Sequence, residues 1–196
     1  MDLDIEKRTQ KMDNMQTELR KHQHTLAVVG MGAIGFGIWS VVKAILYLTI
    51  INPLKDTVLA DYENITDLEY EYLIALGVTI FITILIVLID LLLRWRVGKL
   101  ALDIARGNKL PTARFFVRTG FVILIDALEL VMGFLGIIGV ISSEEELLDS
   151  VSTLLVDLTS VVTLIEMVVA AVMIRKITGQ LKAGQDTSQQ SAVLQK

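Results

Sequence analysis

Carboxylic acids inside long apolar segments are the residues of this chain best suited to chemistry. Asp126 and Glu129 lie in one such segment, and Glu166 lies in another. A charged side chain at the centre of a lipid bilayer costs about 2.5–3.5 kcal/mol, so it marks a proton or ion pathway or a buried pair. A carboxylate can take up a proton or coordinate a cation. We therefore predict that these three residues bind protons or ions.

Two threonines and a further acid at helical spacing extend this candidate site. Thr163 precedes Glu166 by three residues and Thr83 precedes Asp90 by seven, so each pair lies on one face of a helix. We expect these faces to point into a helical bundle, as polar residues do in membranes. A structural alternative stays open, in which the same side chains hold the helices in register through buried pairs and hydrogen bonds.

Three more charged residues are predicted to form ion pairs. At about 1.5 Å per residue, Arg118 lies at the same depth as Asp90, counted from the basic ends of their segments. Lys43 lies at a depth where it meets Glu129 or Asp157. Such pairings offset the cost of placing each charge in lipid. The sequence leaves open whether any metal ion is bound.

Small residues are predicted to bring helices close together. Gly30, Gly32 and Gly35 fit the spacing of the dinucleotide-binding fingerprint, but that motif needs a preceding strand and an aqueous phosphate site. These glycines lie inside an apolar segment, where small residues let a neighbouring helix approach. We predict that they are helix-packing positions, together with Gly133 and Gly136 of a later segment.

No sequence motif points to an enzyme. The absence of cysteine excludes thiol chemistry and disulfides. His22 and His24 lie just before the first apolar segment, a position more typical of a membrane interface than of a metal site. We expect no catalytic residue, no cofactor and no nucleic-acid partner. The triplet at Asn64 is a formal N-glycosylation sequon, which matters only in a host that glycosylates proteins.

Four apolar segments must position these side chains. The chain has 196 residues, of which 53% are hydrophobic, and a bilayer core of about 30 Å needs about 20 consecutive apolar residues for one helix. These lengths predict an all-α membrane protein with a four-transmembrane-helix bundle over residues 26–176. The predicted spans are 26–51, 72–93, 115–141 and 151–174. Residues 1–25 are predicted to be a cytoplasmic amphipathic segment and 177–196 a disordered cytoplasmic tail.

The distribution of basic residues predicts that both termini are cytoplasmic. Five Lys and Arg residues lie in 1–25 and six in 94–114, whereas 52–71 contains one and 142–150 contains none. Short cytoplasmic segments carry an excess of Lys and Arg in membrane proteins. The two acidic loops are therefore expected on the outside, and the protein in the plasma membrane.

Two polar segments are predicted to form helices at the inner membrane surface. Near-heptad spacing separates four apolar residues of the first segment, Ile5, Met12, Met15 and Leu19. This spacing is typical of an amphipathic helix that lies on a membrane or binds a partner. A short interfacial helix is predicted over residues 97–105, between the second and third spans, with Gly107 as its stop.

These predictions favour a subunit of an oligomeric cation- or proton-conducting channel or transporter. Four spans rarely enclose a transport pathway alone, so we expect a homo-oligomer or a partner membrane subunit. The alternative is a non-catalytic interaction protein, whose basic cytoplasmic face binds a partner protein or anionic lipid. An intramembrane enzyme is the least favoured reading of the sequence.

Overall fold

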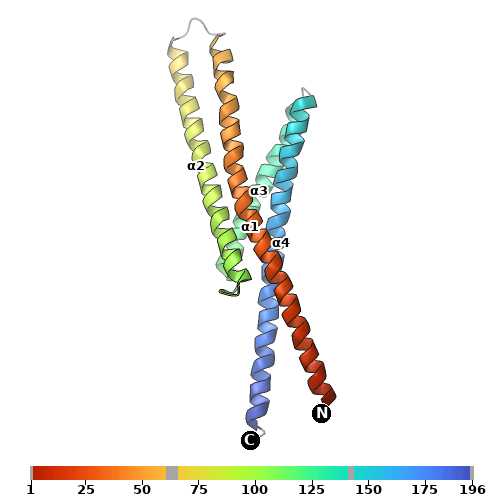
Figure 1. The fold of residues 1–196 in the computed structure, drawn as a ribbon. Helices are drawn as coiled ribbons and strands as arrows, with labels where there is room; N and C mark the ends of the chain where they lie inside the picture. Colours follow the sequence, from red (N-terminus) through yellow and green to blue (C-terminus); the bar gives the residue numbers. More distant parts are fainter. Residues whose placement is uncertain (1, 61–65, 141–143, 195–196) are drawn as a thin grey trace. The chain divides into compact units, whose positions relative to one another are not determined.

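The structure, a computed structural model, describes residues 2–60, 66–140 and 144–194, and helices joined by short turns make up this part of the chain. Figure 1 shows four helices, α1 (Asp2–Ala60), α2 (Thr66–Ala105), α3 (Ala113–Val140) and α4 (Glu144–Leu194). Most side chains are described in residues 6–46, 74–135 and 151–184. The all-α prediction is confirmed for this part of the chain, which contains no strand.

Three of the helices contain segments long and apolar enough to cross a membrane. Within the described residues these are Thr9–Leu46, Leu76–Ala105 and Val151–Gly184. They include most of the first, second and fourth predicted spans. The third predicted span corresponds to α3, whose 28 residues extend about 42 Å at 1.5 Å per residue. That α3 crosses the membrane, and that both termini are cytoplasmic, stay predictions.

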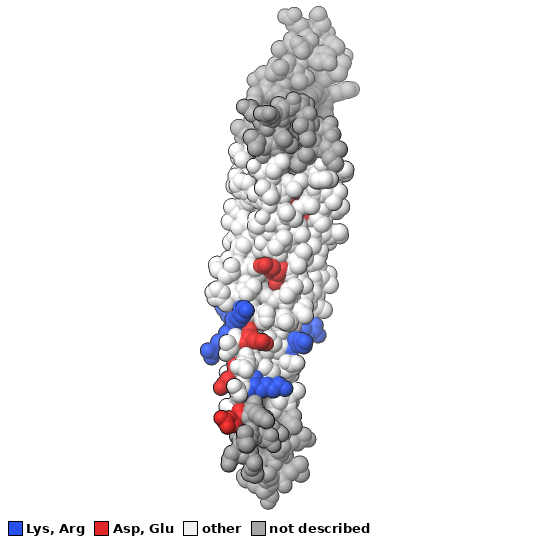
Figure 2. All heavy atoms as spheres, turned by 90° about the vertical axis from the view of Figure 1, so that its right-hand side faces the viewer, with Lys and Arg blue, Asp and Glu red and all other residues white. Residues whose placement is uncertain are grey.

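Large apolar side chains cover the outside of the helices. Phe81 is 68% exposed, Val117 72% and Met132 68%. On the face drawn in Figure 2, the described charged side chains gather in one zone beside a surface with few charges. Extended apolar surface is costly in water but matches hydrocarbon, so this distribution supports a membrane environment.

The chain forms two compact units, and residues 1–33 and 97–196 form the first. All four helices contribute fully buried side chains to this unit, among them Leu26, Ala101, Phe115, Leu164 and Met167. On α3 the buried positions are spaced four, three and four residues apart, at Phe115, Thr119, Val122 and Asp126. This spacing places one stripe of each helix against its neighbours. The second unit comprises residues 34–96.

The segment 97–105, predicted as a separate interfacial helix, is the last part of α2. No proline interrupts the chain between the second predicted span and Gly107, so the helix continues. Gly107 ends it with φ of +75°, a left-handed conformation that favours glycine. The Gly107 N–H donates to the carbonyl of Ile104 at 3.0 Å. Gly107 is thus the stop that the sequence predicts.

The α3 helix begins shortly after Pro111. Proline is common near helix starts, because its fixed φ angle suits the first turn. The Thr112 carbonyl accepts the N–H of Phe115 at 3.0 Å, which makes Thr112 the first hydrogen-bonded residue of the helix. An exposed ion pair joins Lys109 Nζ to Asp103 across the turn at 2.8 Å. These contacts define how the chain reverses from α2 into α3.

Both terminal segments continue the helices of the predicted spans. On α1, Met12, Met15 and Leu19 are half-buried while most of their neighbours are exposed, which matches the predicted amphipathic stripe. The segment from residue 177, predicted to be disordered, is helical as far as Leu194. It contains no proline, and its Gln, Ala, Lys and Leu residues are good helix formers.

Candidate functional site

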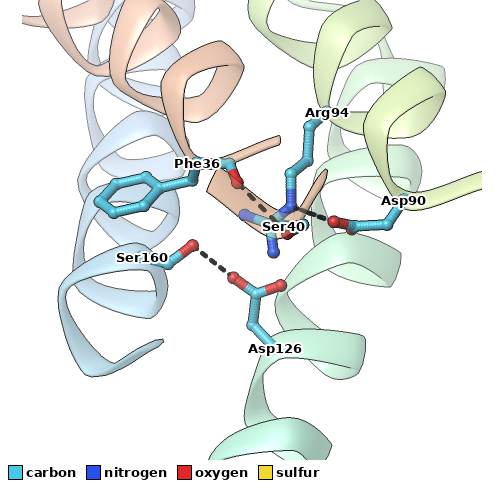
Figure 3. A network of polar contacts seen from close by, with 6 residues as sticks. All are labelled: Phe36, Ser40, Asp90, Arg94, Asp126 and Ser160. Atoms are coloured by element: carbon cyan, nitrogen blue, oxygen red, sulfur yellow. Dashed lines mark hydrogen bonds and ion pairs between the residues drawn. The ribbon is translucent and has the colours of Figure 1, made fainter. Parts of the chain in front are cut away.

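The most buried acid of the predicted site lies between α3 and α4. Asp126 is 1% exposed and Ser160 is 4% exposed. The Ser160 hydroxyl donates a hydrogen bond to Asp126 Oδ2 at 2.6 Å (Figure 3). This distance is that of a short hydroxyl hydrogen bond. The pair therefore places one carboxyl group and one hydroxyl donor inside a packed helical core.

Two apolar stripes bring this pair together. Asp126 ends the buried stripe of α3, and Ser160 begins the buried stripe of α4, which continues through Leu164, Met167, Ala171 and Ile174. The spacing of four and three residues keeps each stripe on one helix face. Because α3 and α4 run antiparallel (Figure 1), the apolar residues set the register at which Asp126 meets Ser160. The polar contact is thus positioned by packing.

A second buried polar contact lies within α2. Arg94 Nε donates to both carboxylate oxygens of Asp90 at 2.9 Å (Figure 3). The exposed fractions are 3% for Arg94 and 6% for Asp90. The sequence predicted Arg118 as the partner of Asp90, but Arg94 lies one helical turn away on the same face, so it pairs without any tertiary contact. Arg118 is exposed on α3.

The structure does not gather the three predicted acids at one point. Asp126 is buried, whereas Glu129 and Glu166 are exposed. Because the helices are antiparallel, Glu129 lies about 4.5 Å from the level of the Asp126–Ser160 contact in one direction and Glu166 about 9 Å in the other. One proton or one ion cannot be shared across that separation.

The other predicted polar residues lie at several places on the helices. Thr163 is half-buried and donates to the carbonyl of Thr159 at 2.8 Å. Thr83, Lys43 and Asp157 are each half-buried, on α2, α1 and α4 respectively. The predicted pairing of Lys43 with Glu129 or Asp157 joins residues of different units and stays a prediction.

The five predicted packing glycines differ in their surroundings. A Cβ on Gly30 would lie 3.0 Å from Ala101 Cβ and 3.2 Å from the Gly98 carbonyl oxygen, and one on Gly32 would lie 3.3 Å from Thr163 Cγ2. A Cβ on Gly35 or Gly133 would meet nothing within 4 Å. The surroundings of Gly136 lie outside the described side chains. Gly30 therefore marks a close approach of α1 to the end of α2.

We expect Gly30→Ala to lower the stability of the protein by about 1–3 kcal/mol, because the added methyl group meets backbone that cannot move easily. Thermal unfolding of the purified full chain in detergent measures this effect. Gly35→Ala is the matched control on the same helix, where the methyl group enters open space. Equal melting temperatures of the two variants would contradict the close approach.

Two residues of these contacts, Ser160 and Arg94, were not predicted from the sequence. Ser160 is small and neutral, so nothing in its type marks it, although it lies in register with the buried α4 residues Leu164 and Met167. Arg94 was assigned to a basic cytoplasmic loop because it follows the second predicted span directly. The signal for Arg94 was its spacing of four residues from Asp90, which is typical of an ion pair on one helix face.

The Asp126–Ser160 contact is suited to proton chemistry. A carboxylate can take up a proton, and a hydroxyl can donate a hydrogen bond to the carboxylate before this step and accept one from the carboxylic acid afterwards. A calcium ion requires about six to eight oxygen ligands. Within the described residues no group of three or more His, Asp or Glu side chains is arranged to hold a metal ion.

No protein-family model, no curated protein and no solved structure matches this chain.

Proposed function

We propose that this protein is a subunit of an oligomeric channel or transporter that conducts protons or cations across the plasma membrane, with the Asp126 carboxyl group as the carrier. The observation that supports this proposal is the burial of Asp126, 1% exposed and hydrogen-bonded by Ser160, within an apolar helix. An acid in such a position is costly, and ionisable residues inside membrane helices commonly serve proton and ion pathways.

A proton is the cargo that this contact favours. The Ser160 hydroxyl can reorient, and the Asp126 carboxyl group can gain or lose one proton. A cation would need further oxygen ligands from water or from another subunit. The proposed cycle therefore consists of proton uptake by Asp126 from one side of the membrane and release to the other side.

An oligomer is part of the proposal because solvent does not reach the core of the first unit. Phe115, Leu164 and Met167 are each 0% exposed. A pathway to Asp126 therefore needs local opening or a boundary shared with another subunit. The exposed acids Glu129 and Glu166 lie on such outer surfaces.

The alternative function is a non-catalytic interaction protein of the membrane. It is supported by the lengths of α1 and α4, 59 and 51 residues, because about 20 residues suffice to cross the hydrocarbon core. Exposed basic residues at the α2–α3 turn, such as Arg106 and Lys109, would suit anionic lipid headgroups. An intramembrane enzyme has no comparable support.

A reconstitution experiment separates the two functions and identifies the cargo. We expect the full chain in proteoliposomes to admit protons when a potassium diffusion potential is applied, with a pH-sensitive dye inside the vesicles as the readout. Parallel vesicles carry gradients of Na⁺, K⁺ or Ca²⁺, and protein-free vesicles are the control. Flux of a cation without proton flux would reassign the cargo. No flux of any ion would reject the transport proposal and favour the interaction protein.

A further inference from the structure

Arg118 on α3 and Glu166 on α4 are charged side chains on the outer surface of the first unit. Both are exposed, and neither forms a hydrogen bond or an ion pair with any other residue that the structure describes. Apolar neighbours surround them on the same surfaces: Val117 is 72% exposed and Val169 is 55% exposed. This surface is suited to hydrocarbon except at the two charges, so each of them needs a partner.

The two charges lie at nearly the same height along the helices. Arg118 precedes Asp126 by eight residues, and Glu166 follows Ser160 by six. Because Asp126 and Ser160 are in contact and the helices are antiparallel, both charges lie on the same side of that contact. The distances along the helix axes are about 12 Å for Arg118 and about 9 Å for Glu166. Their heights therefore agree to within about 3 Å.

A second copy of the chain in the same membrane offers the matching charges. Two copies inserted with the same orientation keep every residue at the same depth, so Arg118 of one copy lies at the level of Glu166 of the other. We propose that these two side chains form an ion pair between neighbouring copies. The pairing removes both charges from lipid at once, which makes the contact specific for this depth and for this partner.

Charge and depth favour this partner over a lipid headgroup. Glu166 repels anionic headgroups, and it lies about 13 Å along α4 from Arg175, where the basic residues begin. An unrelated membrane protein would have to supply both an acid and a base at this depth, whereas a second copy supplies them by symmetry. The proposal goes beyond transport and does not depend on it, because the contact would hold whether or not ions cross the membrane.

Cysteine cross-linking tests the contact directly, because the native chain contains no cysteine. Arg118→Cys and Glu166→Cys are made in separate full-length chains with different tags, reconstituted together and treated with a membrane-permeable bis-maleimide. Such a reagent is needed because two residues joined by an Arg–Glu ion pair can lie further apart than the roughly 7 Å limit between the Cα atoms of a disulfide. The matched control replaces Arg118→Cys by Leu128→Cys, a 58% exposed position on α3 that lies about 15 Å further along the helix. We expect at least tenfold more mixed dimer from the 118–166 combination. Equal or absent cross-linking of that combination would overturn the proposal.

A charge exchange tests the ion pair itself. Arg118→Glu and Glu166→Arg are each expected to lower the fraction of associated chains in native electrophoresis or single-molecule counting by at least threefold. The double variant restores opposite charges and is expected to recover the wild-type fraction. Lys182→Glu, an exposed position further along α4, is the control for a change of net charge. A double variant as dissociated as the single variants would overturn the proposed pairing.

Discussion

Replacing Arg94 by glutamine is expected to destabilise the protein by about 3–5 kcal/mol, the typical cost of removing one partner of a buried ion pair. Arg94 Nε contacts both oxygens of Asp90 at 2.9 Å, and both side chains are buried. Glutamine is too short to reach the carboxylate in the same geometry, so the Asp90 charge loses this donor inside an apolar helix. Denaturant or thermal unfolding of the purified full chain measures the change.

Two further variants separate the ion pair from a general effect of charge on α2. Arg96→Gln removes an exposed arginine two residues away and is expected to leave the stability within about 0.5 kcal/mol of the wild type. Adding Asp90→Asn to Arg94→Gln is expected to recover part of the loss, because both charges are then removed together. Equal stability of Arg94→Gln and Arg96→Gln would contradict a role of the pair in holding the fold.

The membrane-crossing helices are the part of the fold that composition predicts well. Lipid cannot satisfy backbone hydrogen bonds, so a long apolar segment has to form a helix whatever its neighbours are. Three candidate spans agree with this rule within the described residues. Composition could not show where the helices end, because helix ends depend on residues such as Gly107 and not on hydrophobicity. The polar composition after residue 177 therefore predicted a disordered tail, whereas α4 continues to Leu194.

The inward face of each helix was harder to predict than its existence. The sequence placed Glu166 and Thr163 on the inner face of α4, whereas the structure buries Ser160, Leu164 and Met167 and exposes Glu166. In a soluble protein the apolar stripe marks the inside, but in a membrane both the inside and the outside are apolar. The apolar pattern therefore does not distinguish the two faces of α4.

Asp126 and Asp90 illustrate which polar contacts a sequence can reveal. The partner of Asp90 follows it by four residues, so it could have been found from helical spacing alone. The partner of Asp126 lies 34 residues away on another helix, and it depends on the register of α3 against α4. Packing of residues such as Phe115 and Leu164 sets that register, and no spacing rule predicts it.

Asp126→Asn is expected to leave the protein folded and to abolish proton conduction. Asparagine has almost the same shape, and its carbonyl oxygen can still accept the Ser160 hydroxyl hydrogen bond. It cannot take up and release a proton at neutral pH, so a pathway through residue 126 stops. We expect the initial proton flux to fall to the level of protein-free vesicles. Ser160→Ala keeps the carboxyl group and is expected to slow the flux to a lesser degree.

The initial rate of potential-driven proton uptake, compared between wild-type and Asp126→Asn proteoliposomes of equal protein content, tests the central claim most directly. Glu18→Gln is the control, because it removes an exposed acid of α1 that belongs neither to the proposed proton path nor to the proposed contact between copies. The expected result is uptake by the wild type and by Glu18→Gln well above protein-free vesicles, and none by Asp126→Asn. Undiminished uptake by Asp126→Asn would contradict the claim that Asp126 carries the proton.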